Sequence, residues 1–190
     1  IIYGHFFYSN VNYAFDAHYY IELADSFTAG GHFSFLNFPE SIRGYALPLV
    51  YFLAKTIGSF FHIGQNGSIL ILQSICLVLA SAFLFPFFVS KEYKVKYDLR
   101  YLIVVILFFI WWKDLICWAL SDLWAVYFCL AGGFLLEKAF RIQNCAWKKR
   151  VLSFGAGACL YLAYNTRTIY LFADAAIFFI LLFQNRKKER

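Results

Sequence analysis

The sequence predicts an all-α fold, a polytopic bundle of transmembrane helices, and three observations carry this prediction. Of the 190 residues, 62% are hydrophobic and 23% aromatic, whereas only 15% are charged. An ordinary globular domain is much less apolar. Several stretches are nearly free of charge, and the basic residues are confined to short segments between them. We expect residues 1–190 to form a single transmembrane domain that is a fragment of a longer protein.

The lengths of the apolar stretches indicate which of them can cross a membrane. A spanning helix needs about 20 predominantly apolar residues. Two stretches reach this length, 68–89 and 115–136, and two shorter ones are marginal, 151–166 and 168–183. The stretch 101–112 is too short alone, unless the preceding residues KVKYDLR continue its helix with their basic side chains reaching the headgroups. We therefore expect transmembrane helices over residues 68–183, and we interpret Ile1–Phe7 as the tail of an earlier helix.

The basic residues indicate the orientation of these helices. The net charge of +6 arises from clusters in three short segments, 91–100, 138–150 and 186–190. Short basic loops between spans stay on the cytoplasmic side. The charge is thus a topology signal and does not predict binding to nucleic acid. Residues 111–122 and 164–167 are then expected on the extracytoplasmic side.

The number of membrane crossings depends on residues 44–61. Residues 62–67 precede a span that runs from outside to inside, so a full crossing by 44–61 would place the preceding loop 10–43 on the cytoplasmic side. The segment contains Pro48, Lys55 and Gly58, and its uninterrupted apolar run covers only 45–54. A run this short is more typical of an interfacial or re-entrant helix than of a span. We favour a re-entrant or short membrane helix, which leaves residues 10–43 as the first extracytoplasmic loop. The alternative is a full span with one basic loop on the wrong side.

The loop 10–43 is expected to carry a juxtamembrane amphipathic helix. Apolar side chains recur every three or four residues from Ala17 to Phe27, whereas Asp16, Glu22 and Asp25 lie off that stripe. Gly and Pro residues between 29 and 41 end the helix. Such a helix would lie flat on the membrane with its apolar face in lipid. Glu22 and Asp25 would then be solvated.

Charged side chains near an apolar layer are costly and usually line a cavity or a pathway. Asp16, at the start of the loop helix, is a candidate general base that takes a proton from an acceptor hydroxyl. Its alternative role, which the sequence alone favours, is an N-terminal helix residue stabilised by the helix dipole. Arg43 is a candidate phosphate ligand, because a guanidinium matches phosphate oxygens. Its alternative role is an interface anchor.

Arg167 lies in YNTRTIY, between two short apolar stretches, and a cation there needs an anionic partner. The candidates for that partner are Asp174, about two helical turns on, and a bound phosphate. Asp122 is expected to face the same outer cavity, where it would pair with Lys113 or help to hold an acceptor. Alternatively, Ser121 and Asp122 form an ordinary helix N-cap.

Other chemistries have little support in the sequence. The four histidines show no zinc-ligand spacing on one helix, and the sequence contains no GxGxxG, GxxxxGK or GxSxG motif. No CxxC is present, and four of the five cysteines lie in apolar stretches, where cysteine behaves as a small hydrophobe. We expect no metal site and no nucleotide-binding site.

The order of these motifs resembles a known superfamily. FDAHYYIELADSF is followed by RGYALPLVYFLAKTIG, then by SDLWAVYFCLAGGFLLEK and LSFGAGACLYLAYNTRTIYLF. This order is similar to the N-terminal module of the GT-C integral-membrane glycosyltransferases, which include bacterial lipid A aminoarabinose transferases and protein O-mannosyltransferases. The resemblance implies that Asp16 is the catalytic base. It also implies that Arg43, Tyr45 and Pro48 match the family's Pro- and Tyr-rich segment, with Arg167 at the donor phosphate.

The resemblance further implies a polyprenyl-phosphate sugar donor, a glycan, lipid or protein acceptor, and an extracytoplasmic active site on a bacterial inner membrane. The family often has a second acid beside the first, where this chain has Ala17. For this reason a divalent metal is possible but not favoured, and no cofactor other than the lipid-linked donor is expected. The rival interpretations are a transporter or flippase fragment for an anionic lipid or small molecule, and an O-antigen ligase or polymerase.

Overall fold

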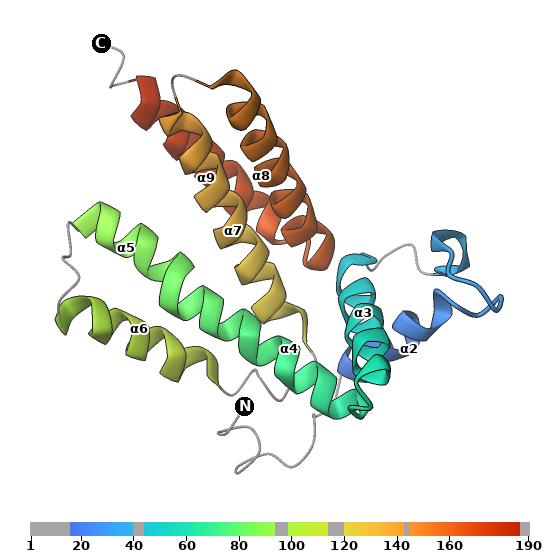
Figure 1. Ribbon diagram of the computed structural model, residues 1–190. Coiled ribbons are helices and arrows are strands. Elements are labelled where there is room, and N and C mark those ends of the chain that lie inside the picture. Colours follow the sequence, from blue (N-terminus) through green and yellow to red (C-terminus); the bar gives the residue numbers. More distant parts are fainter. Residues whose placement is uncertain (1–15, 40–43, 94–98, 114–119, 143–144, 187–190) are drawn as a thin grey trace.

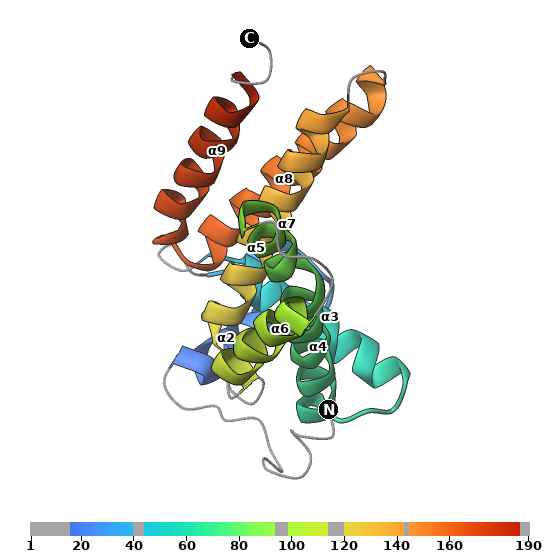
Figure 2. The same cartoon turned by 90° about the vertical axis from the view of Figure 1, so that its left-hand side faces the viewer.

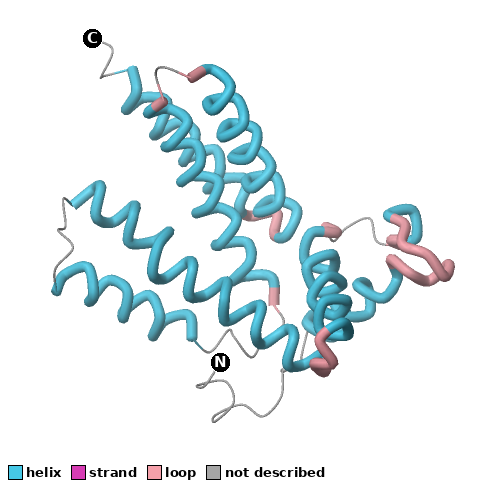
Figure 3. The backbone as a smooth tube through the Cα atoms, viewed as in Figure 1, coloured by secondary structure: helices cyan, strands magenta, loops and turns pink. Residues whose placement is uncertain are grey.

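The computed structural model describes residues 16–39, 44–93, 99–113, 120–142 and 145–186. These residues form helices joined by short loops (Figures 1 and 3), and they contain no β-strand. The all-α prediction is confirmed for this part of the chain. The expected helix tail at Ile1–Phe7 lies outside the described residues.

The described elements follow one another with few long connections. In chain order they are α2 (Asp16–Ser26), the 3₁₀ turn η1 (Phe35–Asn37), α3 (Ala46–Phe60), α4 (Gln65–Leu79), the π-turn η2 (Ala80–Leu84), α5 (Phe85–Tyr93), α6 (Leu99–Trp112), α7 (Ser121–Arg141), α8 (Ala146–Thr166) and α9 (Tyr170–Arg186). Two of the described helices, Gln65–Val89 and Ser121–Arg141, are long and apolar enough to cross a membrane, judged by length and composition. The first matches the predicted span 68–89. The second overlaps the predicted span 115–136 but begins at Ser121 and continues to Arg141, and residues 115–119 lie outside the described residues.

Several helices leave large apolar side chains uncovered. On α6 and α9 the exposed large apolar residues are Leu102, Ile103, Ile106, Leu107, Ile110, Trp111, Leu171, Phe172, Phe178, Phe179 and Ile180. Soluble monomeric proteins rarely expose contiguous apolar patches of this kind. These faces are therefore candidates for contact with an apolar environment.

The long α4–α5 helix contains one π-turn, and Pro86 gives a physical reason for it. Proline has no amide hydrogen, and its ring clashes with the carbonyl four residues earlier, which is that of Ala82. The helix widens there, and the Phe85 amide donates to the Ala80 carbonyl. The Ala82 carbonyl accepts a hydrogen bond from the Tyr101 hydroxyl of α6 at 2.7 Å. The irregularity in one helix thus provides a polar anchor for the next.

Helices α7 and α8 pack through small residues. A Cβ atom at Gly132 of α7 would lie 2.6 Å from the Leu160 side chain of α8, and Ala156 and Ala163 of α8 are buried. Small residues let helix backbones approach closely, as in membrane helix pairs. Helix α9 diverges from α7 and α8 towards the C-terminus (Figure 2).

Helices α2 and α3 pack together near the start of the described chain. The predicted apolar stripe of α2 is confirmed, because Ala17, Tyr20, Ala24 and Phe27 are all buried. That face is covered by protein, chiefly by α3, so the expectation that it inserts into lipid is wrong. An aromatic cluster around Phe27 reinforces this packing.

The charged side chains of α2 also differ from the expectation. Asp25 is not merely solvated, because it forms an ion pair with Lys55 of α3. Glu22 is exposed and lies 3.2 Å from His18 on its own helix. The charge of Lys55 in the apolar helix α3 is thus balanced by the carboxylate of Asp25 from α2.

The segment that we expected to be re-entrant or a short membrane helix forms one continuous helix, α3, without a reversal inside it. Pro48 lies in its first turn, where an amide needs no intrahelical partner. Fifteen residues of α-helix extend only about 22 Å, which is less than the roughly 30 Å hydrocarbon core of a bilayer. The segment is thus a short apolar helix, and its position in a membrane stays a prediction.

The helix ends fall into two groups (Figure 1). The α7–α8 ends and the end of α9 lie towards the upper left of Figure 1, and the end of α5 and the start of α6 lie at its left edge. Helices α2 and α3 and the starts of α4 and α7 lie towards the lower right. The described basic residues at the α7–α8 ends belong to the first group: Lys138, Arg141, Lys148, Lys149 and Arg150.

Candidate functional site

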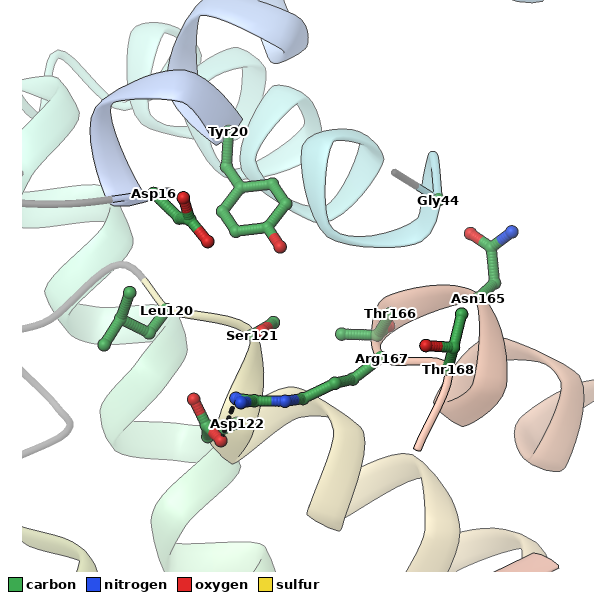
Figure 4. Close-up of a pocket in the computed structure, with 10 residues that line it drawn as sticks. All are labelled: Asp16, Tyr20, Gly44, Leu120, Ser121, Asp122, Asn165, Thr166, Arg167 and Thr168. Carbon is green, nitrogen blue, oxygen red and sulfur yellow. Dashed lines mark hydrogen bonds and ion pairs between the residues drawn. The ribbon is translucent and has the colours of Figure 1, made fainter. Parts of the chain in front are cut away.

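A cavity of about 400 Å³ lies at the N-terminal end of α7 (Figure 4), whereas the basic residues Lys138 and Arg141 lie in the last turn of that helix. Helix α2 contributes Asp16 and Tyr20, and the start of α7 contributes residues 120–122. Residues 165–168, from the end of α8 into the turn before α9, form another wall, and Gly44 before α3 completes it. Four segments that are far apart in the sequence therefore meet at this cavity.

Arg167 crosses the cavity and forms an ion pair with Asp122 (Figure 4). Both side chains are partly exposed. The expected pairing of Arg167 with Asp174 is therefore wrong, because Asp174 is 8% exposed and lies against Cys129 of α7. The expected pairing of Asp122 with Lys113 is also replaced by the pair with Arg167, and Lys113 is not among the described residues that line the cavity. The Arg167–Asp122 pair joins α7 to the turn before α9.

The first turn of α7 lines the cavity. Ser121 and Asp122 do not form the N-cap that the sequence suggests as an alternative, since Leu120 occupies the N-cap position and provides no side-chain cap. Ser121 and Asp122 are instead the first two helical residues. The unpaired amides of a helix N-terminus carry partial positive charge and favour anions. Asp122 lies in this favourable position within the first turn.

Asn165 ties the end of α8 to the start of α3. Its Oδ1 accepts a hydrogen bond of 2.8 Å from the Ala46 amide, which is one of the first amides of α3. A Cβ atom at Gly44 would lie 1.7 Å from the Asn165 carbonyl oxygen, so only glycine allows this close approach. The contact holds the cavity wall next to Arg167 in place.

The remaining predicted site residues have different positions. Asp16 is the first residue of α2, is exposed, and its carboxylate lies beside the Tyr20 ring at the cavity (Figure 4). Tyr45 does not line this cavity but a separate one of about 300 Å³ with Phe35 and Phe38. Its hydroxyl forms a hydrogen bond of 3.5 Å with the Tyr161 hydroxyl of α8. Arg43 lies outside the described residues.

The expected gathering of charged residues is thus present for Asp16, Asp122 and Arg167. Sequence reasoning missed Tyr20, Asn165 and Thr166 as lining residues. Thr166 is 6% exposed, and its hydroxyl has no hydrogen-bond partner in the described structure. The available signal was the unbroken polar run 165–168 between two apolar stretches.

The cavity combines two carboxylates, one guanidinium and the start of a helix. Such a set can accept a proton, bind an anion and hold a hydroxyl group. Within the described ranges, no group of three or more His, Cys, Asp or Glu residues is placed to hold a metal ion. No family model, curated protein or solved structure matches the chain. The resemblance to GT-C enzymes therefore remains a prediction from the residues.

Proposed function

We propose that the chain is part of a polytopic integral-membrane glycosyltransferase of the GT-C type. It would transfer a sugar from a polyprenyl-phosphate donor to an acceptor on the extracytoplasmic side of a bacterial inner membrane. The observation that carries this proposal is the shared cavity of Asp16, Asp122 and Arg167 at the N-terminus of α7. A carboxylate that could accept a proton and a guanidinium that could bind an anion line the same cavity.

The membrane setting rests on three observations. Two helices have the length and composition of spans, and α6 and α9 leave large apolar side chains uncovered. The basic residues Lys138 and Arg141 lie at the opposite end of α7 from the cavity. By the positive-inside rule, the basic end is cytoplasmic and the cavity opens on the other side.

In the proposed mechanism, Asp16 takes the proton of the acceptor hydroxyl as that oxygen attacks the anomeric carbon. The bond between the anomeric carbon and the donor phosphate breaks, and the phosphate leaves with the bonding electrons. Direct displacement inverts the configuration at this carbon. Arg167 and the first amides of α7 would stabilise the negative charge on the leaving phosphate, and Arg43 is a further candidate for this role.

Asp122 has an accessory role in this proposal. It holds Arg167 across the cavity in the structure. A donor phosphate would compete with Asp122 for the guanidinium, because Arg binds phosphate in the same bidentate manner as carboxylate. Asp122 would thus keep Arg167 in position before the donor arrives.

The proposal is tested by replacing Asp16 with Asn in the full-length protein, reconstituted in lipid vesicles with a radiolabelled polyprenyl-phosphate sugar. Loss of a general base lowers the rate of transfer by about 10²–10⁴-fold, whereas binding of the donor should persist. Glu22→Gln is the matched control, because Glu22 is an exposed carboxylate on the same helix and does not line the cavity.

Two results would contradict the proposal. Unchanged transfer in the Asp16→Asn variant would remove Asp16 from the mechanism. Movement of the intact donor across the membrane by the wild-type protein, without sugar transfer, would favour a transporter or flippase.

A further inference from the structure

The end of α7 and the start of α8 together form a basic cluster. Because Gly132 of α7 lies against Leu160 of α8 and the two helices run in opposite directions (Figure 1), the last turn of α7 lies beside the first turn of α8. These two helix ends carry five cations: Lys138, Arg141, Lys148, Lys149 and Arg150. The sequence from 137 to 173 contains one acid, Glu137. The basic cluster therefore has a large excess of positive charge.

The two cations of α7 already have partners within the protein. Arg141 Nε donates to the Glu137 carboxylate at 2.8 Å. The Lys138 ammonium lies 5.3 Å from the centre of the Phe134 ring, within the range of a cation–π interaction. The three cations of α8 are exposed and form no ion pair with any residue that the structure describes. Three adjacent cations thus face outward without a balancing charge.

The position of these three cations does not favour helix α8 itself. A helix N-terminus carries partial positive charge, so cations in its first turn are unfavourable. The first turn of α8 contains no acid, and Cys145 at the N-cap provides no side-chain cap. The stability of the helix therefore does not account for the three cations, whereas an anion from outside the protein would balance their charge.

The apolar residues of α8 indicate the kind of anion. Successive residues of a helix are about 100° apart, so Trp147, Val151 and Phe154 lie on one face, opposite the face that packs on α7. All three are exposed, Trp147 to 72% and Phe154 to 80%. Lys148 and Arg150 flank the start of this face on either side. The surface of α8 thus changes from cationic to apolar along its length.

We propose that the start of α8 binds the head group of an anionic phospholipid, whose acyl chains lie along Val151 and Phe154. Clusters of Lys and Arg at the cytoplasmic end of a membrane helix attract anionic lipids, and tryptophan is enriched at the level of the head groups. A phospholipid has the same order of charge and apolarity as this face of α8. A nucleic acid or free phosphate would match the cations but leave the apolar face uncovered. The inference rests on the membrane setting of the proposed function and not on sugar transfer.

The test replaces the three cations in the full-length protein with glutamine: Lys148→Gln, Lys149→Gln and Arg150→Gln. The protein is held in phosphatidylcholine nanodiscs that contain a small fraction of phosphatidylglycerol with brominated acyl chains, which quench tryptophan fluorescence on contact. The quenching of Trp147 is the difference between each protein and its Trp147→Phe counterpart. Brominated phosphatidylcholine at the same fraction is the uncharged reference lipid.

In wild type we expect phosphatidylglycerol to be enriched at Trp147 over phosphatidylcholine by about tenfold or more. Each Lys or Arg near a membrane surface contributes about 1 kcal/mol to the attraction of anionic lipid, which corresponds to about fivefold in affinity. The glutamine variant should be quenched almost equally by the two lipids. The matched control, Lys148→Arg with Lys149→Arg, keeps the charge and should keep the preference. High salt should lower the preference in wild type, because it screens exposed charges.

An equal preference for phosphatidylglycerol in wild type and in the glutamine variant would overturn the inference, as would the absence of any preference in wild type. Loss of the wild-type preference on addition of a short RNA, or of inorganic phosphate at an ionic strength where chloride has no effect, would also overturn it and would assign the basic cluster to that ligand. The lipid probes are not sugar donors, so this result is independent of the transfer assay on Asp16→Asn.

Discussion

The hydrogen bond between Asn165 and the start of α3 offers a direct test of how the cavity wall is held. The Ala46 amide donates to Asn165 Oδ1 at 2.8 Å, and Ala46 is only 2% exposed. In Asn165→Ala the amide loses this acceptor. A buried donor left without a partner costs about 1–3 kcal/mol, so the free energy of unfolding should fall by that amount.

Asn165→Asp is the matched variant. It keeps an oxygen acceptor in the same place. Its negative charge is favourable at the N-terminus of α3 and unfavourable in the last turn of α8, by similar amounts of about 0.3–1 kcal/mol. We therefore expect the aspartate variant to be about as stable as wild type. A general requirement for the neutral amide side chain would destabilise both variants alike.

The assay is urea unfolding in detergent micelles, followed by circular dichroism, together with hydrogen exchange at the Ala46 amide. That amide should exchange faster in Asn165→Ala and remain protected in Asn165→Asp. Equal unfolding free energies for wild type and Asn165→Ala, with unchanged exchange, would refute the inference that this bond stabilises the junction.

Two further predictions concern helix packing. Tyr101→Phe should cost about 1 kcal/mol of stability, because it removes the donor to the α4–α5 carbonyl next to Pro86. In a Pro86→Ala background this cost should shrink, since the new amide can donate to that carbonyl; an equal cost in both backgrounds would argue against the link. Gly157→Ala should stabilise α8 by up to about 1 kcal/mol through helix propensity, because its Cβ meets nothing within 4 Å. Gly132→Ala should not be stabilising, because its Cβ would lie 2.6 Å from the Leu160 side chain of α8. Equal unfolding free energies for the two alanine variants would contradict this.

Local sequence patterns predicted several elements well. The periodic stripe from Ala17 to Phe27 identified α2. The apolar stretches 68–89 and 115–136 overlap the two described helices that are long enough to span, although the second helix begins and ends further along the chain. These features depend on spacing within one segment. Periodicity and length can be read directly from the chain, because they reflect contacts over three or four residues or the number of residues per unit of helix length.

The errors share a different origin. Asp174 was a reasonable partner for Arg167 on the basis of helical spacing, but Asp122 of another helix forms the pair. The apolar face of α2 was assigned to lipid because no covering element could be identified from sequence, and α3 covers it. Asp25 was expected in solvent, yet it pairs with Lys55 of that same covering helix. Each error concerns a partner from a different helix.

By itself, the sequence determined the helical class, the apolar character of the long helices and the polar nature of residues 165–168. Tertiary structure alone decided that Asp16, Asp122 and Arg167 share one cavity. The physical reason is that a side chain's partner depends on how helices cross. Close contacts of backbone with backbone, such as Asn165 against Gly44, set that crossing between residues far apart in the chain.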